Sequence, residues 1–317
     1  MSSPDQSHTD TAAAAAALAA QRYASVTAID RWLADWAARA WSRLRLTDLQ
    51  GSFVADVIPG LLPQVVSAQV SAAQIGADTV TRAVDAAAAP AASAESPPRV
   101  VPKAFAGYAS DGAPLPKLLA RPLVQTYVDL AGGARPDEAL ARGLDSMDAI
   151  LTTQVHDAAR TAEQVQMAAR MEVTYYVRAT EPGACSRCIL LSGRRYKWSR
   201  SFLRHPRCRC HMTAQTTLTD QPKTPQQLFD ALDAAEQDRV FTTGGAQAIR
   251  DGADIGRVVN ARRNMYTTAG PYGMKLKATT VLAADGETRL LPESIYKVAG
   301  DDRDLAIQLL TRNGYLV

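Results

Sequence analysis

The chain has 317 residues, a formal net charge of +3 and a hydrophobic content of 47%, in which alanine is prominent. This length is enough for two or more compact units, and a net charge this small excludes a chain that is basic overall. Aromatic residues make up only 6%. We therefore expect long helices with thin cores, because alanine favours the helix but buries little apolar surface.

The sequence does not predict a membrane-spanning or secreted protein. No run of 18 or more uncharged apolar residues was identified, so no transmembrane helix is expected. The N-terminal segment lacks a basic region and contains Asp5 and Asp10, unlike a signal peptide. We expect the protein to be made in a reducing cytoplasm, where cysteines bind metals or stay as thiols more often than they form disulfides.

Residues 1–89 are expected to form an N-terminal helical region. Within residues 10–44, apolar side chains recur at helical spacing and so lie on one face: Leu18, Val26, Ile29, Leu33, Ala37, Trp41 and Leu44. This stripe predicts the core of a helical bundle. The alternative is a docking face for a larger partner, because Trp32 and Trp36 lie beside the stripe.

A second helix is expected to follow Thr47 or Asp48, either of which can cap it, and to be kinked or split near Pro59 and Pro63. Residues 90–116 then contain six prolines among serine, alanine and glycine. This composition is typical of a linker or of an irregular segment wrapped over the helices.

Residues 117–221 combine helices with a small sheet. Helical periodicity returns at the start of this region and runs toward Met171. The period then changes, because residues 172–179 are β-branched and aromatic, which is typical of a strand. Two further strands are expected at residues 194–198 and 208–217, which gives a small antiparallel sheet.

Residues 222–317 predict a helical tail. Thr224 can cap a helix in which Pro225 takes the first position and Gln227 completes a capping box. Further helices are expected at 244–251, 254–265 and 301–312. The fold class expected for the chain is therefore α+β: long alanine-rich N-terminal helices, a small antiparallel sheet with a Cys/His cluster, and the helical C-terminal tail.

All four cysteines lie in one stretch with the pattern C-x2-C, a gap of sixteen residues, and then H-x2-C-x-C-H. Two groups of soft ligands separated by a loop are what a tetrahedral Zn²⁺ site needs. On a strand, the last two cysteines would face the same way and His211 the other way. We predict a structural zinc held by the first two cysteines and two of the other three groups: Cys185, Cys188, His205, Cys208 and Cys210.

The same stretch is basic, with seven arginines and one lysine but a single acid, Glu181, between residues 181 and 211. Clustered cations favour the thiolate form of cysteine. With the aromatic residues among them, they also suit nucleic acid or another anionic partner. The candidate partner-binding residues are Arg187, Arg194, Arg195, Lys197, Trp198, Arg204, Arg207 and Arg209. A zinc-ribbon-like nucleic-acid-binding protein is therefore one interpretation, and a basic cover over a small sheet is the other.

The sequence contains no complete catalytic set. No G-x-S-x-G or H-E-x-x-H motif occurs. His156 stands alone on its predicted helix and is expected to be an ordinary surface or boundary residue. Ser192-Gly193 predicts a tight turn with a positive φ at Gly193.

Residues 178–210 resemble the core of the MuF-like domain of tailed-phage minor head proteins. The shared pattern begins with a strand and the C-x2-C pair. It continues with Leu-x-Gly-Arg-x-Tyr at residues 191–196 and closes with His-Pro-x-Cys-x-Cys at residues 205–210. The helical N-terminal half is similar to the actinobacterial-phage version of these proteins, as are residues 244–266 and 295–316.

The resemblance implies a minor capsid protein that acts in phage head morphogenesis near the portal. Its expected partners are the portal protein, the scaffold or the major capsid protein, and possibly packaged DNA, with no membrane partner. Its expected location is the capsid interior of the virion, after assembly in the host cytoplasm. Some relatives carry the label capsid maturation protease, which is the enzymatic alternative.

Overall fold

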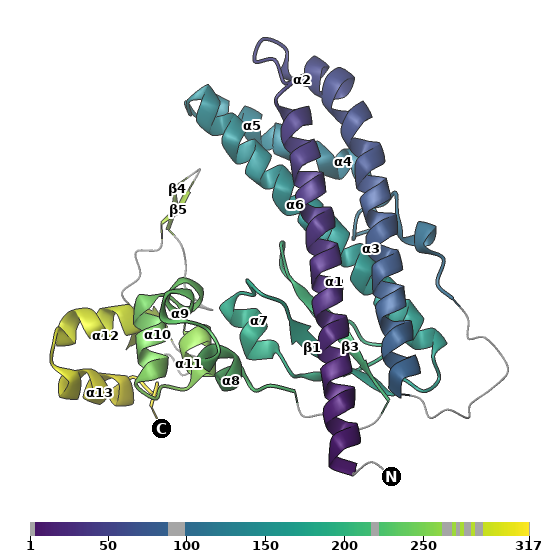
Figure 1. Cartoon of the computed structure of the whole chain (residues 1–317). Coiled ribbons are helices and arrows are strands. Elements are labelled where there is room, and N and C mark those ends of the chain that lie inside the picture. The colour runs from purple at the N-terminus through teal and green to yellow at the C-terminus, as the bar shows by residue number, and fades with distance from the viewer. Residues whose placement is uncertain are drawn as a thin grey trace. The chain divides into compact units, whose positions relative to one another are not determined.

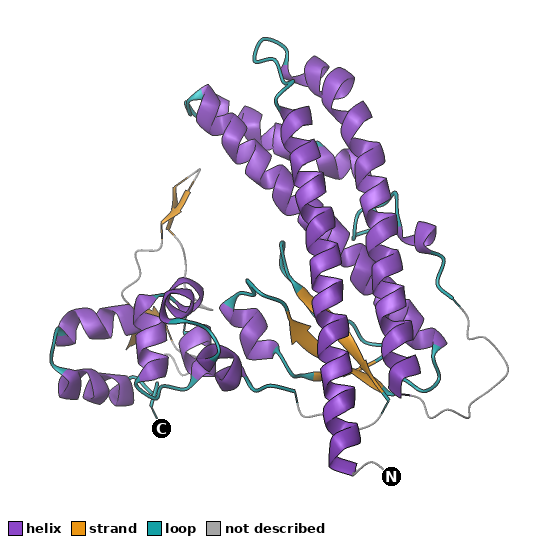
Figure 2. Ribbon diagram, viewed as in Figure 1, coloured by secondary structure: helices purple, strands orange, loops and turns teal. Residues whose placement is uncertain are grey.

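The structure is a computed structural model of the chain. It describes residues 4–87, 99–216, 222–261, 268–270, 273–275, 280–282 and 288–316. Helices dominate it and a small antiparallel sheet accompanies them, so the expected α+β class is confirmed (Figure 2). Contacts between residues divide the chain into two compact units. The first unit holds residues 1–181 and 195–220, and the second holds residues 182–194 and 221–317.

The first unit is built on three long helices, α1 (Pro4–Trp41), α3 (Ile58–Ala87) and α6 (Pro136–Ala169). The three pack against one another and run side by side as the purple, blue and teal helices of Figure 1. The apolar stripe predicted on the first helix is buried at Val26, Leu33, Ala37 and Trp41, with Ile29 and Leu44 packed against it. The prediction of a bundle core is therefore confirmed for this stripe.

Shorter helices complete the bundle: α2 (Leu49–Ser52), α4 (Leu115–Leu119) and α5 (Arg121–Ala131). Asp48 caps α2, because its side chain accepts a hydrogen bond from the backbone of Gly51. The expected split near Pro63 does not occur, since α3 continues through this residue. The departure from α-helical geometry lies just before α3, in a π-helical turn at Phe53–Val57.

Small side chains bring α3 and α6 close together. Ala72, Ala73 and Gly76 are buried on α3, and Ala158 and Ala159 are buried on α6. A Cβ atom added at Gly76 would lie only 2.4 Å from the backbone oxygen of Ala159. The backbones of the two helices therefore contact each other here, which only the absence of a side chain at position 76 permits.

One helical stretch, Leu49–Ala87, is long and apolar enough to cross a membrane by length and composition alone. This finding differs from the expectation that the sequence contains no such helix. Glutamine and serine interrupt the apolar residues of this stretch, but no charged residue lies between Asp56 and Asp78. Its buried residues Leu61, Val65 and Val80 belong to the core of the described structure. Core helices of bundles pass the same test, and 33% of the apolar window of this stretch is buried in the described structure.

The proline-rich segment that precedes α4 is attached to the bundle. Residues 88–98 lie outside the described part of the chain, and a 3-10 helix follows at Pro102–Phe105. Gln69 of α3 donates to the backbone oxygen of Tyr108 and accepts from Gly107 N. Gln154 and Gln166 of α6 accept from two more backbone N–H groups of this segment. From residue 99 onward the segment is a wrap over the helices, one of the two forms expected from its composition.

The sheet of the first unit has three antiparallel strands in the order β2-β1-β3. They are β1 (Tyr175–Thr180), β2 (Arg195–Lys197) and β3 (Cys210–Gln215), so all three expected strands are present. Arg178 pairs with Met212, and Ala179 pairs with His211. Because side chains alternate along a strand, His211 faces the opposite side of the sheet from Cys210 and Met212.

The second unit contains short helices: α7 (Ser186–Leu191), α8 (Pro225–Asp230), α9 (Ala234–Phe241), α10 (Thr243–Arg250), α11 (Ile255–Asn260), α12 (Pro292–Ala299) and α13 (Arg303–Arg312). The capping box at Thr224 and Gln227 is confirmed. Gly193 has φ of 79°, which confirms the predicted turn. Two pairs of antiparallel strands are also present, β4 (Thr268–Gly270) with β5 (Gly273–Lys275) and β6 (Thr280–Leu282) with β7 (Thr288–Leu290).

A matched pair of glycine substitutions on α3 tests the close packing of this helix. We expect Gly76→Ala to lower the free energy of unfolding by about 1–3 kcal/mol, because its methyl group collides with the backbone of α6. Gly60→Ala is the control, since a Cβ atom there would have no heavy atom within 4 Å beyond its own stretch of helix. It should be neutral or stabilising by up to about 1 kcal/mol, because alanine is the better helix former. Equal effects in urea unfolding would contradict the packing argument.

Candidate metal centre and its buried charges

Cys185 and Cys188 lie at the start of a helix. Cys185 is the residue before α7, and its backbone oxygen accepts a hydrogen bond from Ile189 N at 3.0 Å. Residues three apart at a helix start are neighbours on one side, which brings the two sulfur atoms together. Cys188 is buried and Cys185 is partly buried. The C-x2-C spacing therefore forms a pair of ligands through a helical first turn.

His205 and Cys208 are joined by a tight turn. The backbone N–H of Cys208 donates to the backbone oxygen of His205 at 3.1 Å. Arg207 inside this turn has φ of 58°, a conformation that few residues with a side chain adopt. β3 begins two residues after Cys208, at Cys210, and both cysteines are fully buried. The turn and the strand start thus fix the second group of predicted ligands.

The structure gathers all five predicted ligands into two overlapping groups. The ligand atoms of Cys185, Cys188 and His205 lie within 4.8 Å of one another, and so do those of Cys188, Cys208 and Cys210. Cys188 belongs to both groups. His211 belongs to neither, as its position on the opposite face of β3 requires. This cluster could hold a metal ion.

Two buried arginines contact the segment that contains Cys208 and Cys210. Arg160 of α6 donates through Nη1 to the backbone oxygens of Cys208 and Cys210, at 2.9 and 2.8 Å. Arg178 of β1 places Nη2 3.4 Å from the sulfur of Cys210, and its guanidinium lies 4.3 Å from the centre of the Phe202 ring. Positive groups at these positions stabilise thiolates, which are the form of cysteine that binds metal.

Asp157 fixes Arg160 from the opposite side. Its Oδ1 accepts hydrogen bonds from Arg160 Nη2 and from Arg204 Nε, each at 2.5 Å. Burial by itself would raise the pKa of Asp157, but the attraction of Arg160 and the hydrogen bonds from Arg204 and Ser110 outweigh it and lower this pKa. Asp157 is therefore ionised at neutral pH and holds both arginines in place.

The residues predicted to bind an anionic partner divide into two sets. Arg204 is engaged by Asp157, and Arg207 Nη2 contacts Asp145 Oδ1 at 2.6 Å and Asp148 Oδ2 at 3.2 Å. The side chains of these two arginines are therefore occupied within the chain. Five of the others are exposed and lie on α7 or on β2 and the residues beside it: Arg187, Arg194, Arg195, Lys197 and Trp198. Arg209 is partly buried and lies just before β3, between Cys208 and Cys210.

A second buried salt bridge, which the sequence pattern did not predict, lies beside β3. Arg22 of α1 is fully buried. Its Nε donates to Glu163 Oε1 at 2.5 Å and its Nη1 donates to Glu181 Oε1. Glu163 Oε2 in turn accepts from the backbone N–H of Met212 on β3. One arginine therefore connects α1, α6 and the end of β1. The one hint in the sequence that Arg22 is buried is its position, four residues before Val26 of the apolar stripe.

Burial shifts the ionisation of the groups around Arg22. Burial raises the pKa of the Glu181 carboxyl, while the neighbouring Arg22 opposes this rise. Burial, reinforced by Arg22 and Arg160, holds the pKa of His211 well below its usual value, so its ring is neutral. His211 Nδ1 lies 3.4 Å from Glu181 Oε1 but makes no hydrogen bond to it. Because the ring is neutral, we regard this contact as a dipolar one rather than an ion pair.

His156 is not the surface or boundary residue that its isolated position suggested. It is buried, and its Nε2 lies 3.0 Å from Asp30 Oδ2 of α1. Asp30 lies two helical turns after Arg22, so α1 carries two polar contacts to the rest of the first unit on one face. The sequence shows no partner for His156, because Asp30 comes close to it only in the folded chain.

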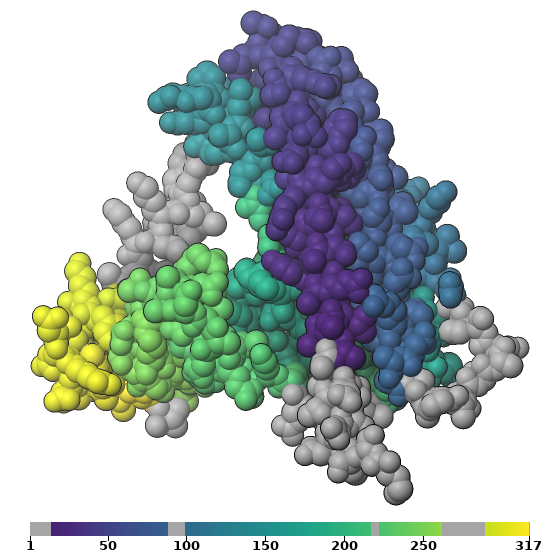
Figure 3. Space-filling view, in the orientation of Figure 1, coloured from purple at the N-terminus to yellow at the C-terminus, as the bar shows by residue number. Residues whose placement is uncertain are grey.

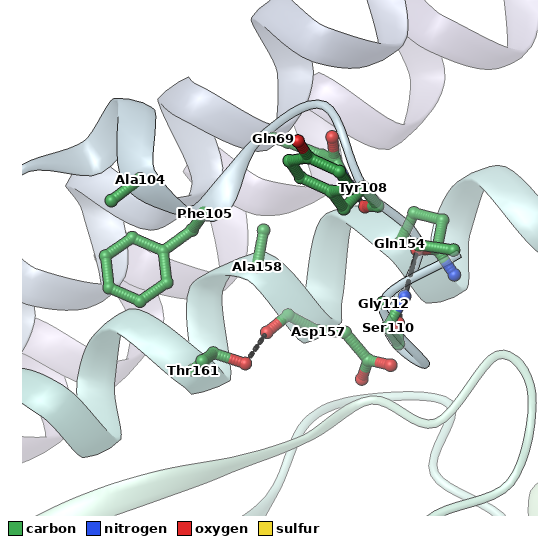
Figure 4. Close-up of a pocket in the computed structure, with 11 residues that line it drawn as sticks. Gln69, Ala104, Phe105, Tyr108, Ser110, Gly112, Gln154, Asp157, Ala158 and Thr161 are labelled. Carbon is green, nitrogen blue, oxygen red and sulfur yellow. Dashed lines mark hydrogen bonds between the residues drawn. The ribbon is translucent and has the colours of Figure 1, made fainter. Parts of the chain in front are cut away.

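A hollow of about 260 Å³ lies between the proline-rich wrap and α6. Figure 4 shows Gln69, Tyr108, Gln154 and Asp157 along its wall. The two glutamines hold the wrap, and Asp157 is engaged by arginines. Ser110 and Asp157 line this hollow and hydrogen-bond each other, but Arg160 and Arg204 hold the carboxylate and lower its pKa, which makes it a poor base. The arrangement explains how the wrap is attached and indicates no reaction.

No protein-family model, curated protein or solved structure matches the chain.

Arg160→Met and Arg207→Met form a matched pair that tests the role of the buried arginine. We expect Arg160→Met to weaken zinc affinity by about 10–100-fold, as loss of a group that orients metal ligands typically does. Arg207→Met should leave the affinity within about threefold, because that guanidinium contacts only surface carboxylates and the backbone of α6. The measurement is competition with a chromophoric zinc chelator. Equal affinities in the two variants would show that Arg160 does not position the ligands.

Proposed function

We propose that the chain is a minor head protein of a tailed phage that acts by binding during procapsid assembly near the portal. The observation that supports this proposal most is the cysteine cluster. The residues that carry the resemblance to MuF-like domains, C-x2-C and His-Pro-x-Cys-x-Cys, are the residues whose ligand atoms come together. The long helices before the sheet fit a protein that offers an extended surface to an assembly.

We propose that the cluster binds one structural Zn²⁺ through Cys185, Cys188 and two of His205, Cys208 and Cys210. Thiolate and imidazole ligands suit zinc, and neither cluster contains a carboxylate. The buried Arg160 and Arg178 offset the negative charge that several thiolates would bring. The metal would cross-link the start of α7, which carries Cys185 and Cys188, to the segment of residues 205–210.

Binding rather than catalysis is the better supported mode of action. A Ser-His or Cys-His protease needs a base that is free to take a proton. His156 and His211 are buried away from solvent, where a protein substrate does not reach them, and His205 belongs to the metal cluster. These three described histidines therefore offer no base for a protease. The maturation-protease alternative has no support beyond the label of relatives.

The nucleic-acid alternative has weaker support than the sequence suggested. Two of its eight candidate residues, Arg204 and Arg207, are held by carboxylates of α6. The exposed Lys197 and Trp198 remain available for an anionic partner. Packaged DNA or an acidic head protein would both meet this surface.

The zinc proposal predicts one Zn²⁺ per chain in protein purified without chelators, measured by elemental analysis. Cys188→Ser should lose the metal and lower the melting temperature, because Cys188 belongs to both ligand groups. His205→Ala distinguishes the ligand sets. It keeps the metal if the four cysteines bind it and loses affinity if the imidazole does. A wild-type chain that is folded and free of metal would refute the proposal.

The binding proposal predicts that the full chain copurifies with procapsids when it is coexpressed with its portal, scaffold and capsid proteins. Trp32 is 39% exposed and lies outside the bundle core, so it is a candidate contact residue. We expect Trp32→Glu to reduce incorporation several-fold, whereas Leu203→Glu, on an exposed residue of another segment, should not. Cleavage of scaffold or capsid protein by the purified wild-type chain would instead favour the protease alternative.

A further inference from the structure

One face of α6 remains exposed in the described structure. The helices α1 and α3 pack against α6, and they form the purple and blue surface in the view of Figure 3. On α6 itself, Thr161, Val165 and Ala168 stay exposed and are spaced by four and three residues. At this spacing they form one row along the helix surface. We call this row the α6 strip.

The proline-rich wrap runs along one flank of the α6 strip. Gln166 and Gln154 of α6 accept hydrogen bonds from backbone N–H groups near the two ends of this segment, at 3.1 and 2.9 Å. The hollow of about 260 Å³ lies between the wrap and α6, with Phe105 of the wrap and Thr161 of the strip in its wall (Figure 4). The strip therefore meets the hollow at its Thr161 end.

The loop of residues 198–204, which follows β2, runs along the other flank. Gln164 of α6 donates to the backbone oxygen of Trp198 at 3.3 Å, and Asp157 accepts from Arg204 at 2.5 Å. The helical repeat places the α6 strip between the side of Gln164 and the side of Gln166. The strip is therefore bordered by chain on both sides. We call the strip with its two flanks the α6 face.

Large apolar side chains are exposed on every part of the α6 face. Val165 is 44% exposed in the middle of the strip. Val101 and Tyr108 are each 65% exposed on the wrap, and Trp198 is 42% exposed on the loop. Single exposed apolar residues are common on protein surfaces, but several that gather along one face indicate an interaction site.

Both flanks of the α6 face are basic. Residues 99–110 of the wrap and residues 195–204 contain no acidic residue and six basic ones: Arg99, Lys103, Arg195, Lys197, Arg200 and Arg204. Asp157, the carboxylate beside the strip, is already engaged by Arg160 and Arg204. Lys103 and Lys197 are exposed, and neither forms an ion pair with a carboxylate of the described residues. A partner would therefore meet positive charge that the chain itself leaves uncompensated.

We propose that the α6 face binds an acidic polypeptide segment that carries large apolar side chains. The apolar side chains of the partner would cover Val101 and Val165, and its carboxylates would meet the lysines of the two flanks. A polypeptide fits better than nucleic acid, because the aliphatic valines bury well against aliphatic side chains, whereas nucleic acid offers phosphates and the flat faces of bases. This site depends on neither the metal ion nor the phage assignment.

Three fluorescent peptides of about 12 residues test the chemistry of the partner, because a helix of that length matches the span of α6 from Gln154 to Gln166. The first contains only glutamate and leucine. In the second, lysine replaces each glutamate, and in the third, serine replaces each leucine. We expect the purified full chain to bind the glutamate–leucine peptide at least about tenfold more tightly than either control in fluorescence anisotropy. Its affinity should fall as salt is added, because salt screens exposed charges. Equal affinities for the three peptides overturn the proposal.

Val165→Glu and Val124→Glu form a matched pair of variants. Both valines are exposed on helices of the first unit, so both variants should keep the melting temperature of the wild-type chain. Val165→Glu places a carboxylate on the strip and should weaken binding of the glutamate–leucine peptide at least about tenfold. Val124→Glu on α5 should leave the affinity within about twofold. Equal affinities of the two folded variants would show that the peptide binds elsewhere.

Single-stranded DNA tests the nucleic-acid alternative for the same face. A thymidine oligonucleotide of about 12 residues should bind at least about tenfold more weakly than the glutamate–leucine peptide at the same salt concentration, because it cannot cover the valines. Tighter binding of the oligonucleotide than of the peptide would assign the α6 face to nucleic acid and overturn the proposal.

Discussion

Burial of arginine beside a three-stranded sheet is the constraint on which the first unit depends. A guanidinium group is costly to remove from water, and it is tolerated only where carboxylates or carbonyl oxygens take up its hydrogen bonds. Arg22 meets two carboxylates, and Arg160 meets Asp157 and two carbonyl oxygens of the cysteine segment. The strands are short, so these contacts fix their position where apolar area alone is small.

The same arginines connect the scaffold to the candidate metal centre. Glu163 and Arg160 lie one turn apart on α6. Glu163 accepts from β3 and from Arg22 of α1, whereas Arg160 holds the carbonyl oxygens of Cys208 and Cys210. One turn of α6 therefore positions both the N-terminal helix and the cysteines. A change in the ligand cluster would therefore alter the contacts of α6 and, through α6, the contacts of α1.

Alanine has two opposite consequences in this chain. Between α3 and α6, alanines and Gly76 allow the backbones to approach closely and so give a well-defined contact. Along residues 14–26 of α1, alanine residues bury little area, and the buried contacts come from Arg22 and Val26. The difference comes from the partner surface, since a small residue packs well only where the opposing backbone can move up to it.

Local structure was largely determined by the sequence. The apolar stripe of α1, the three strands, the capping box at Thr224 and the positive φ of Gly193 follow from periodicity, propensity and turn chemistry, which act over a few residues. The five clustered ligands were also visible, because metal-binding spacing is itself local.

Only the tertiary structure decided which charges are buried and what they contact. Arg22 meets carboxylates 141 and 159 residues away, and His156 meets Asp30 across 126 residues. Arg204 and Arg207, which looked free to bind a partner, are held by carboxylates of α6. A charged residue on a helix has the same local pattern whether water or a distant carboxylate solvates it. Whether such a residue is exposed or buried is therefore decided by the packing of helices and strands that meet only when the chain folds.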